Sequence, residues 1–218
     1  SGILVMDGGR ERLVTGHENG YLAVWSIASS GDLVLLRTVD LRMEEAIDYI
    51  HDDEPLRHIR GLSAWKDGVV IAGGEDGGLH QVRLEDGAVL AQRLFNPDAR
   101  RGVNDLAVRG DSLVVVNCAL DRTDRNVWLF DLERGRFTLD DAANLLEDQD
   151  RERVFAFDVA TYVDGDGAHA LITTKEGLVW RVRIADGRLE PRDRLALGRF
   201  DYGNAIDFEE SRGRLATA

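Results

Sequence analysis

The feature of this sequence that most constrains its fold is a repeat of roughly 50 residues. Four segments end in the same alternation of side chains, and their last residues are separated by 57, 48 and 52 positions. These segments are GYLAVWSI at 20–27, GGLHQVRL at 77–84, RNVWLFDL at 125–132 and GLVWRVRI at 177–184. Alternation over such a length is typical of β-strands, and the recurrence indicates one structural unit repeated along the chain.

Each repeat contains the signals of four strands. Around the first segment, apolar stretches at Gly2–Met6 and Leu13–Thr15 precede it and another at Leu33–Val39 follows it. Short turns rich in Gly, Asp and Asn join these stretches, such as GHENG at 16–20, and such residues supply the positive φ that tight hairpins need. A recurring four-stranded antiparallel unit of this length is typical of a β-propeller blade.

The predicted fold class is therefore all-β, a propeller with short helical insertions between its blades. Four complete blades are expected at roughly 1–40, 58–95, 102–138 and 154–196, followed by a half blade at 202–218. Propellers protect their sheet edges by closing into a ring. The half blade predicts completion by further blades of the same polypeptide or by another chain. A compact five-bladed ring whose last blade is completed elsewhere is the alternative.

Three stretches resemble blades of the WD-repeat family: RLVTGHENGYLAVWSI at 12–27, IAGGEDGGLHQVRL at 71–84 and AIDFEESRGRLATA at 205–218. Trp25 stands at the family's tryptophan position, although no repeat keeps the Trp-Asp ending. Two members of the family's hydrogen-bond tetrad are present in the first blade, Thr15 and Trp25, and two in the second, His58 and Asp76. The resemblance implies a propeller that binds other proteins and carries no chemistry of its own.

Composition excludes several classes of protein. The formal net charge of −13 and the isoelectric point near 4.8 oppose sequence-independent binding to nucleic acid, which depends on a basic surface. The single cysteine, Cys118, excludes an internal disulfide framework and a cysteine-built zinc site. Because no membrane-length apolar run and no signal peptide are recognisable, a cytoplasmic protein is expected. Arginine supplies 25 of the 27 basic residues, which favours a GC-rich, bacterial genome.

Motifs for catalysis are not found. The sequence contains no G-x-S-x-G elbow, H-E-x-x-H pair or phosphate loop. DGDGAH at 164–169 lacks the further ligands of a calcium loop and is predicted to be an exposed turn. We therefore predict no catalytic residues, no metal and no cofactor. An enzyme with a site at the ring axis is the alternative, and it requires convergent carboxylates on the inner strands, where Asp105, Asp158 and Asp207 offer acids in only some blades.

Two histidines have distinct expected roles. His17 lies in the GHENG turn and is predicted to face solvent. His80 lies in register with Ala23, Trp128 and Trp180, each in the third strand of its blade. This shared position predicts packing against a neighbouring blade for the three rings rather than a ligand site.

The long links between blades carry the most distinctive sequences. In 43–50 and 139–146, apolar residues follow the i, i+3, i+4, i+7 spacing of an amphipathic helix. Residues 40–54 hold seven acidic residues against Arg42, a net charge of −6. Residues 138–153 hold six against two arginines, a net charge of −4. Both segments are expected on links and therefore on one face of the propeller.

Clustered charge of one sign accelerates encounter with a partner of opposite sign. We therefore predict that a basic segment of a protein partner docks on the acidic link. The expected contacts are Glu44, Glu45, Asp48, Asp52, Asp53 and Glu54. The expected function is a non-catalytic interaction or sensor scaffold within a larger protein or complex. A propeller hydrolase or lyase and a purely structural chain that completes a multi-chain ring are the alternatives.

Overall fold

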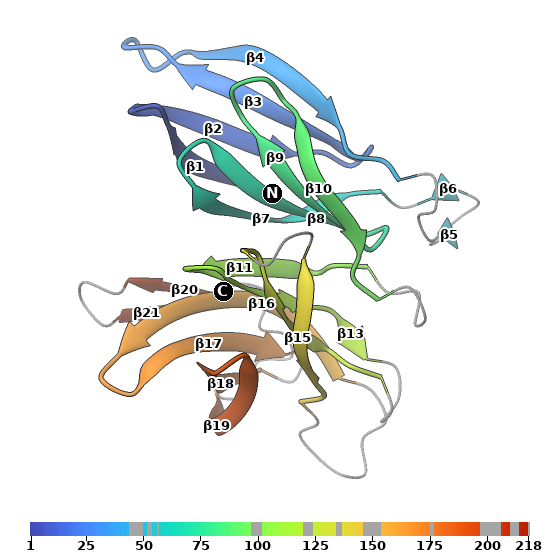
Figure 1. The fold of residues 1–218 in the computed structure, drawn as a ribbon, viewed down its shortest axis with the longest axis vertical. Helices are drawn as coiled ribbons and strands as arrows, with labels where there is room; N and C mark the ends of the chain where they lie inside the picture. The colour runs from blue at the N-terminus through green and yellow to red at the C-terminus, as the bar shows by residue number, and fades with distance from the viewer. Residues whose placement is uncertain are drawn as a thin grey trace. The chain divides into compact units, whose positions relative to one another are not determined.

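The computed structural model describes residues 1–43, 50–51, 54–55, 57–96, 102–119, 124–133, 137–145, 154–174, 177–196, 206–209 and 214–217. Within these ranges every regular element is a β-strand and none is a helix. The chain divides into two compact units, residues 1–103 and 104–218. Figure 1 shows the strands of both units.

The first unit contains two four-stranded antiparallel sheets. Blade 1 consists of β1 (Gly2–Asp7), β2 (Arg10–Gly16), β3 (Tyr21–Ile27) and β4 (Leu33–Asp40). Blade 2 consists of β7 (Ile59–Lys66), β8 (Val69–Gly74), β9 (Gly78–Arg83) and β10 (Val89–Leu94). Between them, β5 (Ile50–His51) and β6 (Glu54–Pro55) form a minimal hairpin. In both blades each strand pairs with its neighbour in the chain, as the repeat predicts.

The second unit repeats this arrangement. Blade 3 consists of β11 (Asp105–Arg109), β12 (Ser112–Val116), β14 (Val127–Asp131) and β15 (Thr138–Ala143). Blade 4 consists of β16 (Val154–Asp164), β17 (Gly167–Thr174), β18 (Leu178–Ala185) and β19 (Arg188–Ala196). The two-residue strand β13 (Cys118–Ala119) pairs with β16 at its free edge. A two-stranded sheet, β20 (Ile206–Glu209) and β21 (Arg214–Thr217), stands at the half blade.

The four blades share one register, which confirms the predicted repeat. In each blade one residue of the third strand is equivalent to Trp25 of blade 1. That residue pairs with the residue just before a β-bulge in the outermost strand. These pairs are Trp25 with Leu35, Val82 with Val89, Phe130 with Leu139 and Val182 with Pro191. A bulge conserved at one register position makes equivalent residues of different blades directly comparable.

The turn before the third strand also repeats. Gly20, Gly77 and Gly177 each stand at the end of this turn, and their φ angles are +81°, +83° and +72°. Only glycine adopts such angles without strain, which explains why the polar turns of these three repeats end in glycine.

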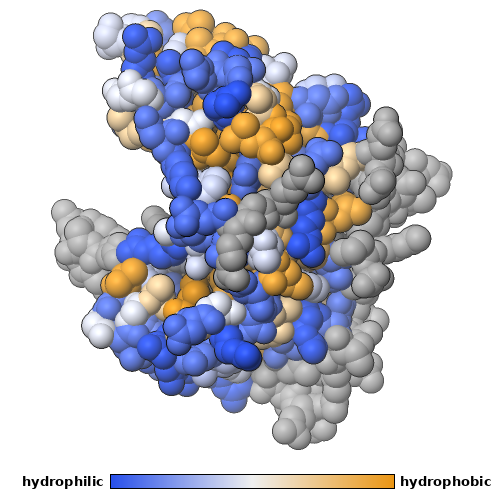
Figure 2. Space-filling model, viewed as in Figure 1, coloured by the Kyte–Doolittle hydropathy of each residue, from blue (hydrophilic) through white to orange (hydrophobic). Residues whose placement is uncertain are grey.

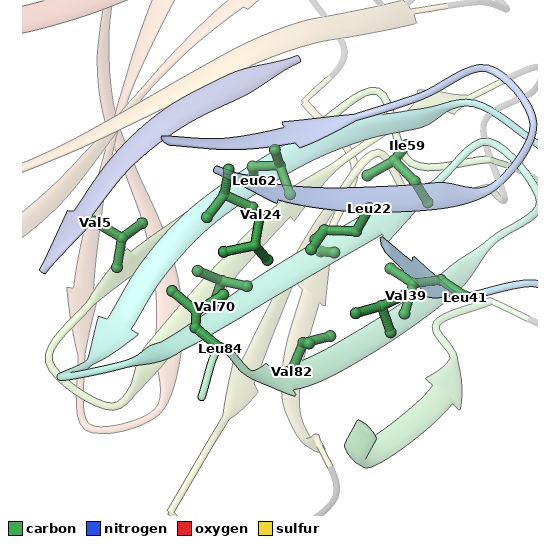
Figure 3. Close-up of a cluster of buried hydrophobic side chains, with 12 residues drawn as sticks. Val5, Leu22, Val24, Val39, Leu41, Ile59, Leu62, Val70, Val82 and Leu84 are labelled. Carbon is green, nitrogen blue, oxygen red and sulfur yellow. The ribbon is translucent and has the colours of Figure 1, made fainter. Parts of the chain in front are cut away.

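Strand alternation gives each blade two faces, which we define on blade 1. Face A carries Val14, Leu22 and Val24, and face B carries Leu13, Thr15 and Trp25. In the first unit, face A of blade 1 and face B of blade 2 form one buried apolar cluster, shown in Figure 3. In the second unit, face A of blade 3 and face B of blade 4 form another. Both clusters therefore follow one packing rule.

Two helical predictions have different outcomes. The helix predicted at 139–146 is wrong, because β15 occupies Thr138–Ala143 and pairs with β14. Its bulge at Asp140 places Leu139 and Ala142 on the same face of the strand, and their three-residue spacing imitates that of a helix. The helix predicted at 43–50 falls mostly on residues 44–49, which lie outside the described residues.

Candidate interaction surface

Most of the predicted acidic contacts lie outside the described residues. This holds for Glu44, Glu45, Asp48, Asp52 and Asp53. Glu54 is described only through its backbone, which pairs with His51 in the β5–β6 hairpin. Docking on the link at 40–54 therefore stays a prediction.

The start of this link is held by Arg42. Asp40 Oδ1 accepts hydrogen bonds from Arg42 Nε at 2.8 Å and from the Arg42 backbone N–H at 3.0 Å. The guanidinium also donates to the Tyr21 hydroxyl at 2.7 Å and lies over the Tyr21 ring. The hydrogen bond from Arg42 lowers the pKa of Asp40 to about 2. One of the seven acidic charges of the segment is thus paired within its own chain.

The start of the second acidic segment was placed wrongly on a link, because Thr138–Ala143 form β15. Asp140 and Asp141 belong to β15, the outermost strand of blade 3. Asp141 Oδ1 accepts the N–H of Ala142, and Asp141 Oδ2 accepts the N–H of Leu189 at 2.9 Å. Asp141 therefore connects blade 3 to blade 4. The other four acidic residues of the segment lie outside the described residues: Glu147, Asp148, Asp150 and Glu152.

Face B of blade 1 carries an apolar row that crosses all four strands. Leu4 pairs with Leu13, Leu13 with Trp25 and Trp25 with Leu35, so these side chains stand side by side. Ile27 and Leu33 form a second pair beside the row. Figure 2 shows hydrophobic residues gathered over β4.

Some positions of this face are buried in other blades but exposed here, whereas Val89 and Leu139, the equivalents of Leu35 in blades 2 and 3, are themselves 38% and 40% exposed. Leu33 of blade 1 is 51% exposed, whereas Leu189, its equivalent in blade 4, is 7% exposed. Ile27 is 37% exposed, whereas Leu84, its equivalent in blade 2, is 2% exposed. Leu4, Met6 and Leu35 are exposed as well. Because large exposed apolar patches mark interaction sites, face B of blade 1 is the candidate surface.

A pocket of about 320 Å³ opens on this face. Its lining comes from β3, β4 and the turn before β3: His17, Asn19, Tyr21, Ala23, Trp25, Leu35 and Thr38. Ala23 stands at the register position that holds His80 in blade 2, Trp128 in blade 3 and Trp180 in blade 4. The small side chain at this position leaves the space that a ring occupies in the other blades.

A hydrogen-bond chain fixes the aromatic wall of the pocket. Trp25 Nε1 donates to Thr15 Oγ1 at 2.9 Å, and Thr15 Oγ1 lies 3.0 Å from His17 Nε2. The Trp25–Thr15 contact is the one that the WD-repeat resemblance implies. His17 is exposed, as predicted, but the sequence did not indicate its contact with Thr15. The signal for it was the two-residue spacing, which places both side chains on one side of the strand.

In blade 2 the residues of the implied tetrad do not meet each other. His58 Nδ1 lies 3.3 Å from Glu75 Oε2, and Asp76 Oδ1 accepts the Gly78 N–H at 3.0 Å. Burial raises the pKa of the Asp76 carboxyl. His80 is buried, as predicted, and burial lowers its pKa to about 4. Within the described chain neither ring nitrogen of His80 has a hydrogen-bond partner.

The inner strands of the second unit bring two carboxyl groups together. Asp105 of β11 and Asp158 of β16 share a hydrogen bond, and burial followed by this contact raises the pKa of Asp105 well above its ordinary value. Asp105 Oδ2 accepts the Val159 N–H at 3.0 Å, and Asp158 Oδ2 accepts the Ile206 N–H at 2.6 Å. Each aspartate thus holds the inner strand of the following sheet. The side chain of Asp207 lies outside the described residues.

Other candidate groups have local explanations. The DGDGAH segment forms the turn between β16 and β17, where Asp164 Oδ1 lies 3.0 Å from the buried His169 Nε2. Among the described side chains, no group of three His, Cys, Asp or Glu is placed to hold a metal ion. The same part of the chain contains no helix with the length and apolar character needed to cross a membrane.

Comparison with known proteins supports the fold. No protein-family model and no curated protein matches the sequence. Among solved structures, the chain is similar to the β-propeller domain of Cps50 (Swd1) from Myceliophteria thermophila, with a TM-score of 0.68 and 13% sequence identity. The match covers the whole of this chain and 63% of that one. At this identity the likeness shows the fold alone, and it confirms the predicted β-propeller architecture.

Proposed function

We propose that this chain is a non-catalytic platform for protein–protein interaction and that face B of blade 1 is its main contact surface. The observation that carries the proposal is the row Leu4, Leu13, Trp25 and Leu35 beside a pocket, with its two end residues exposed and its two middle residues half-buried. Equivalent faces of blades 2 and 4 are buried against another blade. A face built for burial but left uncovered is a surface for binding.

The expected gain from covering this face is large. Apolar surface contributes about 25 cal/mol per Å² on burial, so covering roughly 300 Å² stabilises a complex by up to about 7 kcal/mol before the cost of association. The likeness to a propeller domain is consistent with a binding role, since propellers present rigid surfaces to partners.

The inner-strand carboxyl pair is the feature that a catalytic alternative would use. Its contacts favour a structural role instead. Three of its four oxygens accept backbone N–H groups, because Asp158 Oδ1 also accepts from Val159 at 2.9 Å. A general acid or base needs a carboxyl oxygen free to face substrate. We therefore propose that Asp105 and Asp158 connect sheets and do not carry chemistry.

The acidic link at 40–54 is a second proposed contact. Its net charge of −6 includes Asp40, which is paired with Arg42. We expect the remaining acidic residues to steer a basic segment of the partner toward the platform, with a rate that falls as salt is added.

Affinity capture with matched variants tests the proposal. The wild-type chain, the double variant L4E/L35E and the control L195E are used as baits in extracts of the native host, and bound proteins are quantified by mass spectrometry. Leu195 is an exposed leucine of blade 4. Wild type and L195E should retain the same partners, and L4E/L35E should lose them. Identical partner sets for all three baits would contradict the proposal.

A further inference from the structure

We propose that the pocket over Ala23 binds an indole ring and, resting on the proposed function, that a tryptophan of the protein partner supplies this ring. Blade 3 provides the template, because it carries the indole of Trp128 at the register position of Ala23. Blade 1 has the surroundings of that ring without the ring itself.

The register makes the two sites directly comparable. In blade 3, Asn117 stands two positions after the cross-strand partner of Trp128. In blade 1, His17 stands two positions after the cross-strand partner of Ala23. The N–H groups of His17 and Asn117 also make the same main-chain hydrogen bond, at 2.9 Å and 3.1 Å, to the carbonyl oxygen two residues before the position that is compared. His17 and Asn117 are therefore equivalent.

In blade 3 the polar edge of the indole has a partner. Trp128 Nε1 donates to Asn117 Oδ1 at 2.9 Å, and both side chains are buried. Blade 2 lacks this arrangement, since Gly74 stands at the equivalent position and neither ring nitrogen of His80 has a hydrogen-bond partner within the described chain. Blade 1 keeps a polar side chain, His17, and lacks the ring. A ring from outside blade 1 therefore finds both its space and its hydrogen-bond partner there.

The size and lining of the pocket suit two fused rings. Its volume is about 320 Å³, whereas a cavity of about 150 Å³ accepts a single six-membered ring. Trp25 and Leu35 line it with apolar surface, which favours contact with an aromatic ligand.

His17 supplies the acceptor for the indole N–H. Its Nε2 lies 3.0 Å from Thr15 Oγ1, which also accepts from Trp25 Nε1 at 2.9 Å. In the tautomer that donates from Nε2 to Thr15, Nδ1 carries a lone pair that accepts a hydrogen bond from the ligand. A cationic ligand is disfavoured, because the guanidinium of Arg42 already lies over the ring of Tyr21 in the same pocket.

Binding of small probes tests the pocket directly. Indole and benzothiophene, which has the same two-ring shape but no N–H, are titrated into the isotope-labelled chain, and the NMR signal of Trp25 Nε1–H is followed. We expect indole to bind about fivefold more tightly than benzothiophene, the gain from one hydrogen bond. Ala23→Trp, which fills the pocket from within, should weaken indole binding by about tenfold or more, and Ala23→Ser should bind as wild type does. Unfolding curves verify that both variants fold. No indole-dependent shift in the wild type, or undiminished binding by folded Ala23→Trp, overturns the proposal.

His17 is tested by the ratio of the two affinities. His17→Ala should lower the preference for indole over benzothiophene to near one. His17→Asn, which introduces the residue of blade 3, should keep that preference. If His17→Ala leaves the ratio unchanged, His17 is not the acceptor and that part of the proposal is wrong.

Affinity capture identifies the source of the ring. Ala23→Trp and Ala23→Ser are used as baits beside the wild type, and N-acetyltryptophanamide is added as a competitor. Ala23→Trp should capture about tenfold less of each partner, Ala23→Ser should capture as much as wild type, and the competitor should release the bound proteins. Partners that Ala23→Trp retains overturn a tryptophan of the partner as the ligand.

Two further outcomes separate the possible causes of failure. Loss of partners by L4E/L35E together with their retention by Ala23→Trp leaves the interaction platform intact and removes only the indole site. Retention of the partners by L4E/L35E instead contradicts the proposed function itself. Indole that binds only after Trp180→Phe would identify a ring of this chain as the occupant, which also overturns the proposal.

Discussion

The first prediction concerns the carboxyl group of Asp105, which lies at the joint between two sheets. Burial and the contact with Asp158 raise its pKa in the folded state, whereas the unfolded chain has the ordinary value near 3.9. A raised folded pKa means that the native state holds the proton more tightly. The contribution of Asp105 to stability is therefore complete below about pH 3.9 and is lost as the pH rises through the raised value.

The contacts set the magnitude of this effect. Between the ordinary and the raised pKa the unfolded chain has lost this proton and the folded chain still holds it, so the free energy of unfolding decreases by up to about 1.4 kcal/mol per pH unit, the limit for one proton. Asp105→Asn keeps an oxygen for the Val159 N–H and gains an N–H for Asp158, so it imitates the protonated form without titrating. Asp105→Ala removes one acceptor of the Val159 N–H, but Asp158 Oδ1 remains as a second acceptor for the same group. We expect Asp105→Ala to cost about 1 kcal/mol at low pH, the lower end for a lost hydrogen-bond partner.

Urea unfolding between pH 4 and 8, followed by tryptophan fluorescence, measures these differences. The stability of Asp105→Asn minus that of wild type should increase with pH, because other titrating groups cancel in the difference. Asp193→Asn, which removes an exposed partner of Arg181, is the control and should show a flat difference. A flat difference for Asp105→Asn as well would refute the reasoning, since the carboxyl would then titrate alike in both states.

Three further predictions follow from other contacts. Thr15→Val removes the acceptor of Trp25 Nε1 and should lower the free energy of unfolding by about 1 kcal/mol in urea titrations, whereas Thr15→Ser should be closer to wild type. The neutral ring of His80 is buried with a pKa of about 4, so protonation favours the unfolded chain and the wild type should lose up to about 3 kcal/mol of stability between pH 6.5 and 4. His80→Leu should abolish this loss. Equal acid sensitivity of both proteins would contradict the prediction. Replacing Glu44, Glu45 and Asp48 by Lys should slow association with a captured basic partner several-fold at low salt in stopped-flow measurements. The thermal midpoint of the variant should stay within a degree or two of the wild-type value. An unchanged association rate would mean that the link is only a solvated surface.

Sequence alone predicted the blades because two signals agree in three of the four repeats. Alternating side chains marked the third strands, and Gly20, Gly77 and Gly177 marked the turns before three of them. The fourth strand of blade 3 was predicted to end at Thr138, and most of β15 was predicted as a helix because its alternation is interrupted. Asp140 occupies the bulge, so the apolar residues on either side of it are no longer two positions apart. The same bulge occurs at Leu36 and Leu90, where neighbouring apolar residues conceal the break.

The candidate surface could not be predicted from the sequence, because its exposure depends on whether a neighbouring blade covers it. Leu33 and Leu189 are both leucines at one register position, yet their exposure differs more than sevenfold. Nothing in either side chain encodes that difference. The pocket has a weak signal in the sequence, since Ala23 stands out against His80, Trp128 and Trp180 once the four repeats are aligned. Contacts such as Thr15 with His17 depend on how a turn closes, which spacing alone does not fix.

Face B of blade 1 must satisfy one requirement that it shares with the other faces B and a second that is its own. It has to remain apolar, because the repeat uses the same positions to bury one blade on the next. It also has to discriminate between partners, because an apolar row without further features would accept any apolar surface. Ala23 meets the second requirement, since a pocket beside Trp25 rewards only a partner with a side chain that reaches into it. The His17–Thr15–Trp25 chain holds the wall of that pocket in place before binding, which reduces the ordering cost of association. A partner that lacks such a side chain would leave the pocket empty and lose part of the affinity, so specificity arises from one small residue within an otherwise repeated surface.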